Sequence, residues 1–155
     1  MPSNLLYFDL ETQKSADEVG GWNNKKDMRM SGYPGKTTSL SFTKGGKWLA
    51  TSGSDAIVIW PFTGGGPMGK APTELAGGDD ITCTVCLSHP IQEAIAGGFA
   101  DGVVVLADVQ SGRILPIAAP GRGPMSALAW SPDGVHLAFG SETGFAGLVD
   151  FTKRS

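Results

Sequence analysis

Short segments in which apolar and polar residues alternate recur along the chain, and each segment ends in a turn rich in glycine or proline. Three stretches, residues 39–61, 84–108 and 126–150, follow the same plan. Each opens with a short alternating segment, meets a turn, and continues through a second strand, another turn and a third strand. The pattern predicts an all-β protein built from a repeated unit.

The strands of the three copies can be aligned by their apolar residues. We expect first strands at 40–42 and 127–130, second strands at 48–52, 94–98 and 136–140, and third strands at 57–60, 103–106 and 145–149. A fragment of the same third strand opens the chain at residues 5–9. Residues 27–30, 72–75 and 113–117 supply a fourth strand. Proline in or beside the last two segments fits a strand at the edge of its sheet.

The spacing of the third strands connects the repeat to a known architecture. These strands end at Asp9, Pro61, Asp108 and Asp150, a period of about 42 to 52 residues, and one four-stranded propeller blade takes about 40 to 45. The dipeptides Phe8-Asp9, Trp60-Pro61, Ala107-Asp108 and Val149-Asp150 stand where the WD-repeat β-propeller family has its Trp-Asp pair. The chain resembles this family along nearly its whole length. The turn Ser131-Pro132-Asp133-Gly134 resembles the first turn of bacterial members, and residues 100–103 resemble the turn between second and third strands.

The repeats are degenerate as signature sequences. No copy keeps both Trp and Asp at the end of its third strand, and no Gly-His pair precedes a first strand. The family commonly carries a buried hydrogen-bond network of Asp, His, Ser or Thr, and Trp. We therefore do not expect that network to form in full here.

The resemblance implies a partial β-propeller of about three four-stranded WD-like blades. We expect a single domain, 1–155, with the third and fourth strands of a split blade and an insertion at 1–34. Blades follow at 35–78 and 79–119, and a final blade without its fourth strand lies at 120–155. Propellers typically close with about four to eight blades, so the sheet edges need a cover. A second copy in a homodimer, a different chain, or missing sequence of a longer protein would complete the ring.

Charge and hydropathy exclude several classes of partner. The formal net charge is −3, and the charged residues are spread along the whole length. No basic block is present to follow a phosphate backbone or an anionic membrane, which argues against nucleic acid and membrane partners. No segment approaches the roughly 18 apolar residues of a membrane helix, and the N-terminus has no signal-peptide pattern. We expect a cytoplasmic protein.

Cys83, Cys86 and His89 form a C-x-x-C-x-x-H string that raises a metal-site hypothesis. On a regular strand the odd spacing sends the two thiols to opposite faces, so neither a disulfide nor shared ligation forms easily without a bulge. No second cluster supplies the remaining ligands. We expect two small buried thiols, no metal site and no cofactor.

Two further motifs bear on catalysis. Residues 64–71 match the G-x-x-x-x-G-K pattern of a phosphate-binding loop, but Ala71 stands where a hydroxyl residue must hold magnesium. Pro72 then interrupts the helix that must follow. His89 and His136 are the only histidines, and no serine lies in a G-x-S-x-G turn. We expect no catalytic residues and no enzyme activity.

What remains is a binding face. In propellers the loops entering the first strands gather with the turns between second and third strands on one rim. Here these loops combine glycine or proline with polar or aromatic groups, which suits a peptide or loop of another protein. The expected contact residues are Tyr33, Lys36, Asp79, Asp80, Arg122 and Glu142, with Asp55 and Asp101 nearby.

We therefore expect a noncatalytic propeller that acts as a protein-protein interaction scaffold. One alternative is a small-molecule or metal-binding propeller, with Asp79, Asp80, Cys83 and His89 as contributors. The other alternative is a C-terminal fragment of a larger regulatory protein or enzyme.

Overall fold

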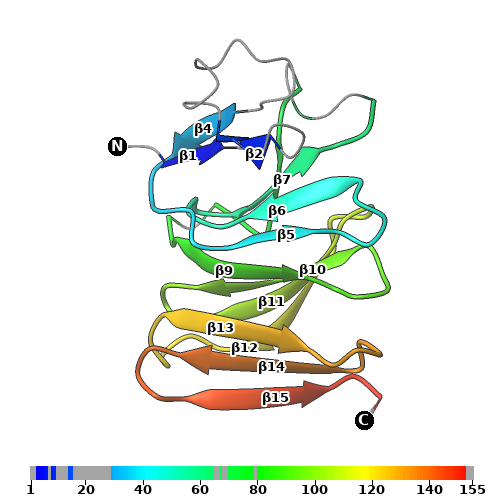
Figure 1. The fold of residues 1–155 in the computed structure, drawn as a ribbon. Helices are drawn as coiled ribbons and strands as arrows, with labels where there is room; N and C mark the ends of the chain where they lie inside the picture. The colour runs from blue at the N-terminus through cyan, green and yellow to red at the C-terminus, as the bar shows by residue number, and fades with distance from the viewer. Residues whose placement is uncertain are drawn as a thin grey trace.

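The computed structural model describes residues 3–6, 8–9, 14–15, 29–64, 67, 70–78 and 80–152. Within these residues the regular elements are all strands (Figure 1), which confirms the predicted all-β class. The described part of the chain contains no helix long and apolar enough to cross a membrane.

Three antiparallel sheets stack one above the other (Figure 1). The first sheet contains β5 (Leu40–Phe42), β6 (Trp48–Thr51), β7 (Ile57–Pro61) and β8 (Thr73–Leu75). The middle sheet contains β9 (Cys83–Ser88), β10 (Ala94–Phe99), β11 (Val104–Asp108) and β12 (Ile114–Ala118). The third sheet contains β13 (Met125–Trp130), β14 (His136–Ser141) and β15 (Ala146–Asp150). Each strand pairs with its neighbour in the sequence, as in a propeller blade.

The N-terminal strands depart from the expected single strand at 5–9. β1 (Ser3–Leu6) pairs with β4 (Arg29–Tyr33), whereas β2 (Phe8–Asp9) pairs with β3 (Lys14–Ser15). The expected strand is thus divided, because its two halves have different partners. The expected partner segment, 27–30, is described only from Arg29 onward.

The core lies between the sheets. Ile57 and Ile59 of the first sheet pack with Ile95, Val105 and Ala107 of the middle sheet. The other face of the middle sheet packs against the third sheet in a second cluster that contains Ala96, Val104, Met125, Leu137 and Phe139. Neighbouring residues of β11 alternate between the two clusters, as the pleat of a strand requires. The middle sheet is therefore buried on both faces at β10 and β11, whereas its outer strand β12 is largely exposed.

Two adjacent glycines allow this close stacking. A Cβ atom on Gly97 would lie 2.5 Å from Cδ1 of Ile57 in the first sheet, and one on Gly98 would lie 2.6 Å from Cβ of Met125 in the third sheet. Real Cβ atoms do not approach other atoms so closely. β10 can be sandwiched between its neighbours because its backbone at these two positions carries no side chain.

Hydroxyl groups bridge the edge strands of the first and middle sheets. Ser39 Oγ donates to the Cys86 carbonyl at 2.7 Å and accepts from the Cys86 N–H at 3.1 Å. Ser41 Oγ accepts from the Ser88 N–H at 2.9 Å. These bonds satisfy backbone groups that an edge strand would otherwise leave bare.

Candidate partner-binding rim

Backbone hydrogen bonds join each loop that enters a first strand to the turn between second and third strands. In the first repeat Gly35 N–H donates to Gly53 O at 2.8 Å, and in the second Ala100 N–H donates to Thr82 O at 2.8 Å. In the third repeat Glu142 N–H donates to Pro124 O at 2.9 Å. We call the end of the stack formed by these loops and turns the rim.

Bonds between repeats continue along the same end. Gly53 N–H donates to Cys83 O at 2.9 Å, and Gly121 N–H donates to Asp101 O at 2.9 Å. The rim is therefore a connected surface built by all three sheets, and side chains from different repeats can contact one partner.

Tyr33 differs from the predicted contact residues Lys36, Asp80, Arg122 and Glu142 because it is buried, with 3% of its surface exposed. Trp60 Nε1–H donates to the Tyr33 hydroxyl at 2.5 Å, and the Tyr33 hydroxyl lies 2.6 Å from Thr51 Oγ1. Thr51 Oγ1 in turn donates to the Val58 carbonyl at 3.1 Å. Burial raises the pKa of Tyr33, although the bonds to Thr51 and Trp60 oppose the rise. The phenol belongs to the core of the first sheet and offers a partner little surface.

This chain of bonds is a reduced form of the network that sequence analysis did not expect in full. Thr51 and Trp60 supply its Thr and Trp members, and the Tyr33 hydroxyl joins them in the absence of histidine. The signal was present in the sequence, because Gly32-Tyr33 precedes the first strand where the family has Gly-His.

Lys36 and Glu142 line one hollow of about 410 Å³, together with Thr38, Thr82, Cys83, Thr84, Met125 and Ser126. Seven of the eight lining residues lie in or just before the first strands of the three sheets, and Glu142 lies in the turn between β14 and β15. The structure thus brings together a cation and an anion that are far apart in the sequence.

The remaining described contact residues, Arg122 and Asp80, lie on separate loops. The Arg122 guanidinium stacks 4.3 Å above the centre of the Phe145 ring, and Thr143 Oγ1 donates to the Arg122 carbonyl at 2.5 Å. Asp80 is exposed and has a positive φ of 56°. Asp79 lies outside the described residues.

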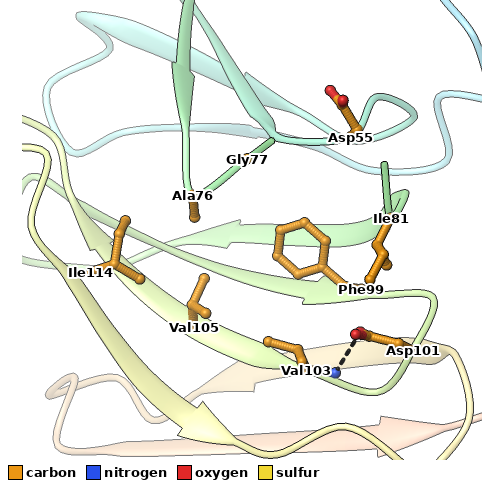
Figure 2. Close-up of a pocket in the computed structure, with 9 residues that line it drawn as sticks. All are labelled: Asp55, Ala76, Gly77, Ile81, Phe99, Asp101, Val103, Val105 and Ile114. Atoms are coloured by element: carbon orange, nitrogen blue, oxygen red, sulfur yellow. Dashed lines mark hydrogen bonds between the residues drawn. The ribbon is translucent and has the colours of Figure 1, made fainter. Parts of the chain in front are cut away.

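A second pocket, of about 260 Å³, lies between the first and middle sheets (Figure 2). Asp55 and Asp101 line it with an apolar set that sequence analysis did not identify: Ala76, Gly77, Ile81, Phe99, Val103, Val105 and Ile114. Asp101 Oδ1 accepts from the Val103 N–H at 3.1 Å, and Asp55 Oδ1 accepts from the Ser54 hydroxyl at 3.4 Å. Both aspartates are thereby held in their turns.

Cys83, Cys86 and His89, the residues of the metal-site hypothesis, are all buried. A register shift near Thr84, typical of a β-bulge, places Cys83 and Cys86 in the same apolar cluster instead of on opposite faces. Burial raises the pKa of Cys86 to about 12, and it raises that of Cys83 as well. Both thiols are free and protonated at neutral pH.

His89 is occupied on both ring nitrogens. Its Nδ1 accepts from the N–H groups of Ile91 and Gln92, each at 3.0 Å, so Nε2 carries the proton and donates to Gly134 O at 3.0 Å. Among the described residues no group of three or more His, Cys, Asp or Glu side chains could hold a metal ion. This arrangement supports core packing and provides no general base.

Comparison with known proteins agrees with this architecture, although no protein-family model matches the chain. The chain is 30% identical over 154 residues to Protein LST8 homolog of Drosophila melanogaster, covering 97% of the chain and 44% of that protein. It is 27% identical over 150 residues to Autophagy-related protein 16 of Arabidopsis thaliana, covering 94% of the chain and 26% of that protein. The chain thus spans less than half the length of these relatives.

The fold is similar to the crystal structure of the Myceliophteria thermophila Cps50 (Swd1) beta-propeller domain. The TM-score is 0.66 at 17% sequence identity, over 96% of this chain and 46% of that one. The stack of two four-stranded sheets and one three-stranded sheet therefore defines a β-propeller fold. The repeat pattern and these relatives support the resemblance to the WD-repeat β-propeller family. The likeness to bacterial members in particular stays a prediction.

Proposed function

We propose that the chain is a noncatalytic interaction scaffold that binds a protein partner at its rim. The observation that carries the proposal is the hollow of about 410 Å³ that Lys36 and Glu142, of opposite charge, both line. Opposite charges on the wall of one hollow select a partner segment with the complementary order of charges. The buried free thiols of Cys83 and Cys86 are in keeping with a reducing compartment, and we place the protein in the cytoplasm.

The chemistry of the described residues supports binding over catalysis. His89 uses both ring nitrogens in structural bonds, and the two thiols are protonated and buried. A nucleophile needs an adjacent base or a lowered pKa, and neither cysteine has a lowered one.

Affinity capture from the native cell with charge-reversed variants tests the proposal. Lys36→Glu and Glu142→Lys each replace an attraction with a repulsion, and we expect each to reduce capture of one partner about tenfold. Lys44→Glu is the matched control, because Lys44 is an exposed lysine in the turn between β5 and β6, at the other end of the strands. Equal capture by all variants, or no partner, would overturn the proposal.

A second part of the proposal is self-assembly, and it rests on the outer face of the third sheet. Strand register aligns Trp60, Ala107 and Val149 as equivalent residues, so Leu148 corresponds to Ile59 and Leu106. Ile59 is buried, whereas Leu148 is 66% exposed. We propose that residues 1–155 form one domain, a partial propeller. A second copy of this domain covers the exposed face of the third sheet.

Light scattering at micromolar concentration tests self-assembly separately from the rim. The wild-type chain is expected to be a dimer and Leu148→Glu a monomer with unchanged unfolding, because the substituted side chain is exposed in the isolated chain. A wild-type monomer, or a dimer unaffected by Leu148→Glu, would contradict self-assembly by this face and leave the rim proposal standing.

A further inference from the structure

The pocket between the first and middle sheets has the size of a single side chain. Its volume is about 260 Å³, whereas pockets for drug-sized ligands typically run from about 300 to 1,000 Å³. It opens beside the rim, since the turns that carry Asp55 and Asp101 are rim turns. A partner held at the rim could therefore extend one residue into it.

The pocket has an apolar interior. Phe99 and Val105 line it with only 5% and 7% of their surfaces exposed, and Ile81 lies beside the Phe99 ring (Figure 2). Such a lining favours a hydrocarbon chain, because burying each additional CH₂ group is favourable in water.

The charge of the pocket has one sign. Asp55 comes from the first sheet and Asp101 from the middle sheet, and both lie at the same end of the pocket, with Phe99 and Ile81 between them (Figure 2). None of the nine lining residues is basic. The hydrogen bonds to Val103 and Ser54 fix both carboxylates from within their own turns, and each of those bonds uses Oδ1.

We propose that this pocket binds the side chain of a lysine or arginine from a partner protein. The alkyl stem would pack on Phe99 and Val105, and the cationic head would lie at the rim end of the pocket, beside the Phe99 ring and within the negative field of Asp55 and Asp101. Long basic side chains combine an apolar stem with a charged tip in this way, and a cation near the Phe99 ring gains further attraction. The proposal rests on the proposed scaffold function and adds the chemistry of one contact.

Binding of three small probes to the isotopically labelled full chain tests the proposal. N-acetyl-lysine amide and N-acetyl-arginine amide carry the basic head, whereas N-acetyl-norleucine amide carries only the stem. Binding is followed by the nuclear magnetic resonance signal of the Val103 amide. We expect at least one basic probe to bind saturably and at least about tenfold more tightly than norleucine amide. Its binding should weaken as the salt concentration is raised. No saturable binding, or equal binding by all three, would overturn the proposal. The preferred basic probe identifies the residue.

Isosteric variants separate charge from folding. Asp55→Asn and Asp101→Asn keep an oxygen that can accept the bonds from Ser54 and Val103, and each should weaken the basic probe about three- to fivefold. Asp133→Asn is the control, because Asp133 Oδ1 likewise accepts from Val135 N–H in a turn at the other end of the strands. Equal binding by all three variants, with unchanged thermal unfolding, would contradict the proposal.

The two proposals fail in distinguishable ways. The probe titration needs no partner, so failed capture through Lys36 and Glu142 would leave its result readable. If the basic probes bind no more tightly than norleucine amide, the proposed basic contact in the pocket is wrong. The capture result for Lys36 and Glu142 is unaffected by that outcome.

Discussion

The middle and third sheets follow one plan but differ in burial. All six residues of β10 in the middle sheet are buried, whereas only two of the six residues of the equivalent β14 are. The next strands differ in the same way, since Val104 is fully buried in β11 whereas the equivalent Ala146 is exposed in β15. Because the repeats are otherwise alike, the difference shows how much of a blade's burial is supplied by its neighbours.

The first strands of the sheets also differ in whether their side chains bond to a neighbouring sheet. Hydroxyls of Ser39 and Ser41, in and just before β5, bond the backbone of β9. At the corresponding positions of the third sheet stand Ala127 and Ala129, whose small side chains are exposed. The contact between the first and middle sheets is thus fixed by directional bonds. The outer face of the third sheet is apolar around Leu148, but it also carries His136 and Asp150, whose Nε2 and Oδ2 atoms lie 3.5 Å apart. Because these two polar groups pair with each other, the face can accept a neighbour without leaving them unpaired.

The largest expected effect comes from truncating one leucine on each face of the third sheet, which tests the difference in burial between its two faces. Leu137 is fully buried and Leu148 is 66% exposed. We expect Leu137→Ala to lower the free energy of unfolding by about 2 to 5 kcal/mol and Leu148→Ala to change it by less than about 0.5 kcal/mol. Urea unfolding, measured where the wild-type chain is monomeric, gives both values. Equal losses would show that the outer face is buried within the folded chain.

Much of the fold could be predicted because the repeats carry mutually consistent signals. Third strands expected at 57–60 and 103–106 are observed as β7 and β11, and their apolar runs are bounded by turns on both sides. The N-terminal segment carries only a fragment of the repeat, without the first and second strands that support the alignment elsewhere, and the strand expected at 5–9 is divided between β1 and β2.

The site could be predicted less well because it depends on contacts between repeats. From its loop sequence Tyr33 is expected to be an exposed contact residue. Thr51 and Trp60 lie within hydrogen-bond distance of its hydroxyl and hold it in the core. The pocket at Asp55 and Asp101 requires Ile81 and Ile114, which come from opposite edges of the middle sheet. Alternation along one strand carries no information about such distant neighbours.

A smaller expected effect gives a sharper comparison, because the two substitutions are chemically identical. Gly98 and Gly140 are equivalent residues of β10 and β14, paired with Val85 and Ala127 respectively. A Cβ on Gly98 would lie 2.6 Å from Met125 Cβ, whereas one on Gly140 would meet no atom closer than 3.9 Å. We expect Gly98→Ala to destabilise the protein by about 1 to 3 kcal/mol through overpacking. Gly140→Ala should stabilise it by about 0.5 kcal/mol, because alanine loses less backbone entropy on folding. Urea unfolding of both variants measures the difference, and equal changes at the two positions would mean that the third sheet does not press on β10 and that the stacked arrangement is wrong.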